Sequence, residues 1–205
     1  MRNHKFAIGE YYHVYNRGVD KRNIFEDLRD LGRFIKSIRE FNTLEPIGSL
    51  YELSFIKPDN TPKSKTLVKI VAYCVNKNHF HFLLTPLVDQ GVEKFMQRIG
   101  GYTRYFNEKH KRTGALFQGK FKSKHVANNT YLLHLSAYIN MNNRNPLGSR
   151  TTKLSKSSLE EYQKKERGFC EKEIITSQFK NSATYLKFCQ ESWEDTQARR
   201  KALEI

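Results

Sequence analysis

The sequence predicts an α+β fold, a ferredoxin-like antiparallel sheet with helices packed on one face. Strand-like and helix-like segments follow the order strand, helix, strand, strand, helix, strand, helix, which such a sheet accommodates. The strand-like runs 68–75 and 79–86 are separated by three residues, a hairpin-length connection that favours antiparallel pairing. The chain has 205 residues and 38% hydrophobic content, enough for one core and a small appendage.

Each element of the first half has its own signal. Residues 10–18, "EYYHVYNRG", are aromatic and β-branched and end in a turn sequence, which indicates a strand. The following helix is predicted by apolar side chains at helical spacing, namely Leu28, Leu31, Phe34, Ile35 and Ile38. Residues 45–66 contain three of the five prolines and predict an insertion or an extended hairpin.

The second half continues the pattern. Residues 91–110 are helical in period, with a weak point at Gly100 and Gly101. Residues 115–126, "ALFQGKFKSKHV", alternate as a strand with one basic face would, and Asn128 or Asn129 can cap the helix that follows. After Pro146 the composition becomes polar. We therefore predict a domain over residues 1–148, and over 149–205 a linker with a small helical C-terminal extension.

The charge of the chain indicates its partner. A formal net charge of +15 and a pI near 9.7 oppose compaction, so they favour a polyanionic partner, nucleic acid rather than a membrane. No run approaches the length of a spanning helix, and the N-terminus lacks the apolar region of a signal peptide, so we expect a cytoplasmic protein without membrane contact. Three cysteines without CxxC spacing argue against a disulfide framework and a structural zinc site.

Residues 98–125 carry eight Lys or Arg and one acid, interleaved with five aromatic side chains. Such runs are usually solvated faces, yet this mixture suits a groove that neutralises phosphates and stacks unpaired bases. The candidate DNA-binding residues, which include one arginine from the first strand, are Arg17, Arg98, Arg104, Lys120, Lys122 and Lys124.

Two histidines interrupt an apolar strand in "NHFHFLL". His79 and His81 project from the same strand face, about 7 Å apart, so one metal ion can bridge them. A His-x-His pair alone is a weak signal, because surface or hydrogen-bonded core histidines give the same pattern. In the last predicted helix, Tyr138 and Asn142 lie one turn apart on a stripe that also includes His134. Core packing for the tyrosine and capping for the asparagine are the alternatives.

Four segments in the same order as in a known family carry a resemblance: "YYHVYNRG", "VAYCVNKNHFHFLL", "GYTRYFNEKHKRTGALFQGKFKS" and "YLLHLSAYINMNNRNPLG". Over residues 10–148 the chain resembles the single-tyrosine HUH transposases, and within them the REP-associated tyrosine transposases. The resemblance implies that Tyr138 is the nucleophile and that His79, His81 and Asn142 hold a divalent ion, Mg²⁺ or Mn²⁺. The family usually shows Met-Pro-Asn before the first histidine, where this chain has Asn76, Lys77 and Asn78.

The predicted function is a metal-dependent transposase that cleaves and rejoins single-stranded DNA through a 5'-phosphotyrosine intermediate. By resemblance its substrate is a repeat-derived hairpin with flanking guide bases, bound by a monomer or homodimer. Attack by a tyrosine at neutral pH needs a nearby cation or base, for which Lys120, Lys122, Lys124 and His134 are candidates. The alternatives are a non-catalytic nucleic-acid-binding module on the same fold and an HUH replication initiator or relaxase.

Overall fold

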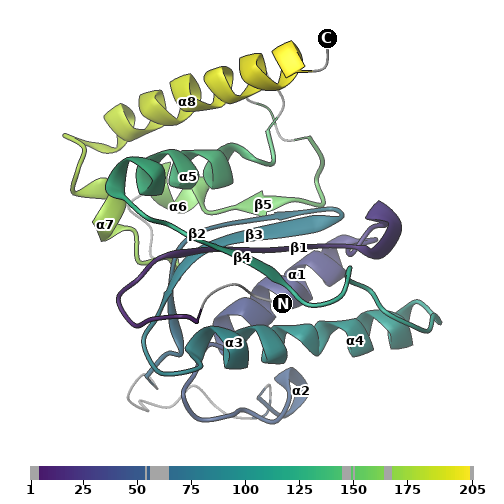
Figure 1. Ribbon diagram of the computed structural model, residues 1–205. Helices are drawn as coiled ribbons and strands as arrows, with labels where there is room; N and C mark the ends of the chain where they lie inside the picture. Colours follow the sequence, from purple (N-terminus) through teal and green to yellow (C-terminus); the bar gives the residue numbers. More distant parts are fainter. Residues whose placement is uncertain are drawn as a thin grey trace.

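The computed structural model describes residues 5–53, 55, 65–144, 149, 151–163 and 168–203. Its centre is a five-stranded sheet with the order β4-β1-β3-β2-β5 (Figure 1). All pairs are antiparallel, which confirms the predicted α+β class and the predicted hairpin. The strands are β1 (Tyr12–Arg17), β2 (Val68–Asn76), β3 (His79–Pro86), β4 (Lys122–His125) and β5 (Lys156–Ser157).

Helices cover both faces of this sheet (Figure 1), whereas the sequence predicted one covered face. The helices on one side are α1 (Leu28–Glu40), α3 (Gly91–Gly100) and α4 (Tyr102–Lys109), with the short α2 (Leu50–Leu53) beside them. Those on the other are α5 (Asn129–Met141), α6 (Leu159–Gln163), α7 (Glu173–Thr176) and α8 (Ser182–Leu203). The physical reason is that eight of the nine residues of β2 are buried, so both of its faces need cover.

The alternation of β3 divides the core in two. Phe80, Phe82 and Leu84 belong to the cluster under α1 and α3, while Leu83 belongs to the cluster under α5. The histidines of β3 share the face of Leu83, and they are only partly buried. The sheet therefore presents its histidines to α5 and its phenylalanines to the opposite layer.

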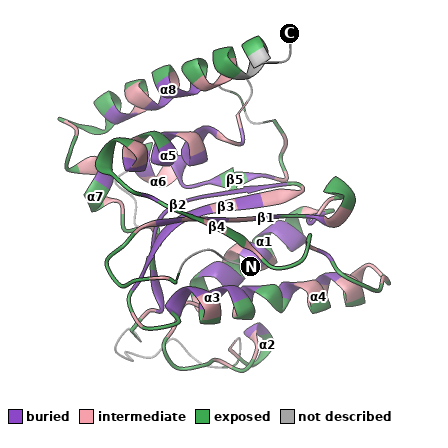
Figure 2. Ribbon diagram, in the orientation of Figure 1, coloured by how far each residue is buried: buried purple, intermediate pink, exposed green. Residues whose placement is uncertain are grey.

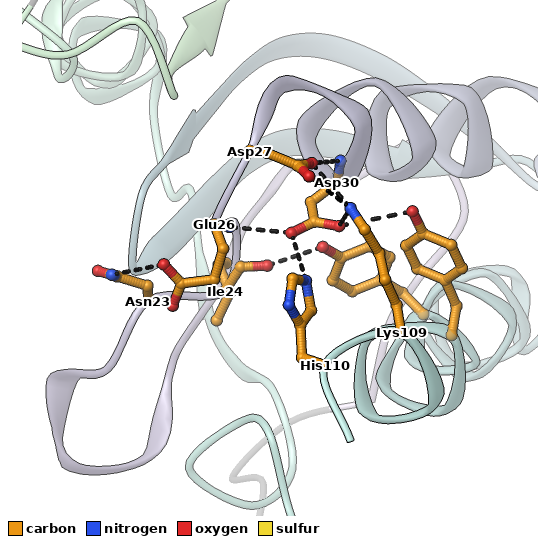
Figure 3. A network of polar contacts seen from close by, with 9 residues as sticks. Asn23, Ile24, Glu26, Asp27, Asp30, Lys109 and His110 are labelled. Carbon is orange, nitrogen blue, oxygen red and sulfur yellow. Dashed lines mark hydrogen bonds and ion pairs between the residues drawn. The ribbon is translucent and has the colours of Figure 1, made fainter. Parts of the chain in front are cut away.

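A buried carboxylate ties α1 to α4 (Figure 3). Asp30 has a fully buried side chain, and it accepts hydrogen bonds from Lys109 Nζ at 2.6 Å, His110 Nε2 at 2.9 Å and the backbone N–H of Glu26 at 2.9 Å. Lys109 also reaches Asp27, the residue that caps α1 through the N–H of Asp30. These contacts fix the end of α4, and with it the start of the segment that returns to the sheet.

That returning segment forms a shorter strand than predicted. Residues 115–126 were expected to be extended throughout, but β4 spans only Lys122–His125, and Phe117 makes an isolated bridge with Gly18. Gly119 has φ +68°, which interrupts an extended strand. The basic face is retained, because Lys122 and Lys124 pair with Tyr15 and His13 of β1.

The chain after α5 covers that helix. Part of the segment predicted as a linker forms β5, which pairs with β2, and α8 packs along α5 with its inner side buried and its outer side exposed (Figure 2). The buried hydroxyl of Tyr185 on α8 is 2.8 Å from Asn140 Nδ2. Residues 54, 56–64, 145–148, 150 and 164–167, which include part of the expected insertion, lie outside the described residues, and the domain limits stay a prediction. No helix in the described part of the chain is both long and apolar enough to cross a membrane.

Candidate active site

The candidate site lies between the histidine face of the sheet and helix α5. Antiparallel register places His79 opposite Arg17 and His81 opposite Tyr15, on the face that α5 covers. The predicted cap of α5 is confirmed at Asn128, whose Oδ1 accepts from the N–H of Tyr131 at 2.8 Å. Helix α5 thus begins at a fixed point and carries its polar stripe across the two histidines.

One cavity of about 310 Å³ brings the predicted catalytic and metal-binding residues together. The rings of His79 and His81 are 5.1 Å apart, and those of His81 and Tyr138 are 5.8 Å apart and nearly perpendicular. The side chains that line the cavity are Tyr15, Asn16, Arg17, His79, His81, Gln118, Lys122, Tyr138 and Asn142.

The contacts of His79 fix its tautomer. Its Nδ1 lies 2.6 Å from Asn78 Oδ1, which can only accept, so Nδ1 is the protonated nitrogen. Burial lowers the pKa of His79, the nearby Asn142 Oδ1 favours a protonated Nε2 and opposes this, and the charge of Arg17 lowers the pKa further. The ring is therefore neutral at pH 7 and carries a lone pair on Nε2, which lies 3.1 Å from Asn142 Oδ1.

A second histidine, which the sequence analysis missed, orients His81. His13 Nε2 lies 2.8 Å from His81 Nδ1, and the two rings stack at 5.0 Å. Burial, helped by the charge of Lys124, lowers the pKa of His13 to about 4, so this ring is neutral and can accept from a protonated Nδ1 of His81. With that tautomer, His81 Nε2 carries the lone pair. The sequence signal that could have identified His13 is the alternation of His13, Tyr15 and Arg17, which places the three side chains on one face of the first strand.

These donors suit a divalent ion. No group of three or more His, Cys, Asp or Glu side chains able to hold a metal is found among the described residues. Asn142 supplies an amide oxygen beside His79. Two neutral imidazoles and one amide oxygen form a set that Mn²⁺ accepts readily and Mg²⁺ less readily.

The predicted DNA-binding residues separate into two groups. Arg17 and Lys122 line the cavity that contains Tyr138. Lys124 lies on the same face of β4, with its ammonium 5.1 Å from the centre of the Tyr131 ring. Three of the six therefore lie on the sheet face that carries the histidines.

The other three lie away from the histidines. Lys120 lines a separate cavity of about 500 Å³ with Phe80, Phe117 and residues of α3. Arg104 is exposed on α4 and pairs with Glu108 at 2.7 Å. Arg98 donates to three backbone carbonyls between residues 41 and 44, which gives it a structural role in closing that loop.

The structure also distinguishes among the four side chains predicted as candidates for activating the Tyr138 hydroxyl. His134 Nδ1 lies 2.9 Å from Ser192 Oγ, in a neighbouring cavity between α5 and α8 that Tyr138 also lines. Among the four candidates for activation, Lys122 lines the cavity of the two histidines. Tyr15 lines that cavity as well. It is therefore an alternative nucleophile, which the sequence analysis did not consider.

Comparison with known proteins gives a family match over part of the chain. Residues 60–142 match the model of the IS200-like transposases, which confirms over this segment the resemblance to single-tyrosine transposases. No curated protein matches the chain. Among solved structures, a REP-associated tyrosine transposase bound to a REP hairpin is similar, with 14% identity, a TM-score of 0.46, and 69% of this chain and 71% of that chain covered.

Proposed function

We propose that the protein, whose residues 60–142 match the model of the IS200-like transposases, cleaves and rejoins single-stranded DNA with Tyr138 as nucleophile. The observation that carries the proposal is the single cavity lined by Tyr138, both strand histidines and Asn142. These four residues come from two segments that are distant in the sequence. Packing of the core does not require their polar side-chain atoms, so a function for these atoms is favoured. A repeat-derived hairpin with flanking guide bases is the proposed substrate.

The proposed reaction is an in-line displacement at phosphorus. The phenol oxygen of Tyr138 forms a bond to phosphorus while the bond to the 3'-oxygen breaks. The phenol proton is lost to a base, and the 3'-oxygen takes up a proton. The products are a 5'-phosphotyrosine and a free 3'-hydroxyl. Because the new ester retains the energy of the broken bond, attack by another 3'-hydroxyl rejoins the strand without ATP.

The cavity supplies positive charge where the reaction develops negative charge. Arg17 and Lys122 line it with Tyr138, so both can approach a bound phosphate and favour a negatively charged tyrosine oxygen. His79, His81 and Asn142 would hold a divalent ion, which when bound polarises a non-bridging phosphate oxygen. Asn78 holds the His79 ring in the tautomer that leaves Nε2 available, and His13 does the same for His81 when it accepts from His81 Nδ1.

The test is to trap the covalent product. A labelled single strand that contains a hairpin is incubated with Mn²⁺ and the protein, and a denaturing gel resolves the protein-linked fragment. Wild type should give an adduct and Tyr138→Phe none, since this change removes one oxygen and little volume. Tyr15→Phe is the matched control, because it alters a second tyrosine of the same cavity and should retain the adduct.

The outcomes separate the candidate functions. An adduct that survives in Tyr138→Phe and disappears in Tyr15→Phe would move the nucleophile from α5 to β1 and refute the assignment. If wild type binds the hairpin but forms no adduct under any metal condition, the protein is a nucleic-acid-binding module and the enzymatic proposal fails.

A further inference from the structure

Asn76, the last residue of β2, reaches into the group of atoms proposed to bind the metal. It is 6% exposed, and its Nδ2 lies 2.8 Å from Asn142 Oδ1 and 3.1 Å from His79 Nε2. Those two acceptor atoms are themselves 3.1 Å apart. Three side-chain atoms from three residues therefore form a triangle with edges of 2.8, 3.1 and 3.1 Å.

The size of this triangle is the relevant observation. An octahedral ion with metal–ligand bonds of about 2.1 Å has neighbouring ligand atoms about 3.0 Å apart. The three atoms thus match one face of such an octahedron. Without an ion, the amide N–H groups of Asn76 satisfy the two acceptors. A half-turn of the same amide puts its carbonyl oxygen in the place of Nδ2, because the two ends of the group are nearly equal in size.

We propose that Asn76 is a further metal ligand, which turns its amide from donor to oxygen ligand when the ion binds. The inference rests on the proposed function, since it concerns the same metal site. Asn76 lies in the segment where the chain departs from the Met-Pro-Asn that is usual in the family it resembles, so the family pattern assigns it no role. It adds an oxygen donor to the two imidazoles and the amide of Asn142.

A different role would also account for the contacts. Asn76 could act only as a hydrogen-bond donor that positions Asn142, and loss of its side chain would then weaken metal binding indirectly. The two roles differ in their response to aspartate. A ligand oxygen becomes charged in Asn76→Asp and binds the ion more tightly, whereas a lost donor leaves a carboxylate facing Asn142 Oδ1 and weakens the site.

The experiment measures Mn²⁺ affinity by the loss of the free-ion EPR signal, in the absence of DNA. Asn76→Leu keeps the branched shape and should weaken binding by at least about tenfold, in the range found when partners of a metal site are removed. Asn76→Asp should tighten it. Gln118→Glu is the matched control, because it adds the same charge to a side chain that lines the cavity but supplies none of the three atoms of the triangle, and it should change affinity less.

Unfolding curves of each variant in EDTA establish that it is folded. Unchanged or tighter Mn²⁺ binding by Asn76→Leu, or weaker binding by Asn76→Asp, would overturn the ligand assignment while leaving the tyrosine chemistry intact. Absence of Mn²⁺ binding by wild type, or Mn²⁺ binding that is unchanged in His79→Ala, would overturn the ligand assignment and the metal dependence together. Wild type that binds Mn²⁺ through Asn76 but forms no DNA adduct would retain the inference and remove the proposed function.

Discussion

Replacement of Asp30 tests whether the α1–α4 contacts stabilise the layer opposite the histidines. In Asp30→Ala, His110 and the N–H of Glu26 lose their shared acceptor, while Lys109 keeps Asp27. Hydrogen bonds to a charged group contribute about 1.5 kcal/mol each at the low end of their range, so three of them give about 4.5 kcal/mol. Loss of a buried charged partner costs about 3–5 kcal/mol, which agrees.

The free energy of unfolding is measured by urea denaturation followed by circular dichroism. Asp30→Asn keeps the shape and one acceptor oxygen, so it should lose roughly half as much, about 2 kcal/mol, and provides a folded variant if the alanine protein does not fold. Asp27→Asn is the control: asparagine caps a helix as well as aspartate, and the half-exposed ion pair of Asp27 with Lys109 contributes little, so this variant should lose far less stability than Asp30→Ala.

The same carboxylate should make stability depend on pH. Burial raises the pKa of Asp30, but hydrogen bonds from Lys109, Glu26 and His110 outweigh it, and the pKa in the folded state is lowered. Its stabilisation is therefore fully present above the ordinary pKa of about 3.9 and is lost as pH falls through the folded value. The difference between wild type and Asp30→Ala should shrink below about pH 4. A loss under about 1 kcal/mol at pH 7, or a difference independent of pH, would refute this reasoning.

Three further outcomes follow from the site and from α8. His79→Ala and His81→Ala should each abolish Mn²⁺-dependent cleavage but leave hairpin affinity in EDTA within about twofold; cleavage by the double variant in EDTA would contradict the metal site. Wild-type affinity should fall at least about tenfold between 50 and 200 mM salt, and Arg17→Ala or Lys122→Ala should each reduce the salt slope by about 0.7, which fluorescence anisotropy would detect. An unchanged salt slope would mean that Arg17 and Lys122 do not contact DNA phosphates. Tyr185→Phe leaves two buried partners on α5 without its hydroxyl and should reduce stability by about 1–3 kcal/mol in thermal unfolding; an unchanged midpoint would mean that the hydroxyl is dispensable.

Local signals in the sequence predicted the parts of the fold that depend on neighbouring residues. The hairpin and the cap at Asn128 are determined within a few positions, although the predicted three-residue connection is one of two residues because β2 continues through Asn76. The break between α3 and α4 lies at Gly101, which ends one helix and begins the next. The alternation of β3 likewise placed His79 and His81 together, because side-chain direction on a strand has period two.

The parts that depend on distant contacts were not predictable. Helices cover both faces because α5 packs on β2 and α8 in turn packs on α5. The apolar run of β2 is compatible with two covered faces, but it does not identify the distant segments that provide the cover. His13 and Asn76 act through partners 68 and 66 positions away, so neither is recognisable as a site residue from its own surroundings. Arg98 was predicted to bind DNA because it lies in a basic run, and nothing in the sequence indicates that its guanidinium also donates to distant backbone carbonyls.

The strand order has a consequence for how the molecule behaves at high concentration. The two outermost strands, β4 and β5, have four and two residues, while the longest strands lie inside the sheet. An outer strand presents unpaired N–H and C=O groups that can template pairing with a second sheet, and short strands with lysines suppress this. Lys122, Lys124 and Lys156 lie on these strands. In the described part of the chain, the sheet therefore offers little backbone for edge-to-edge aggregation. Lys122 lines the cavity and also helps to protect this edge.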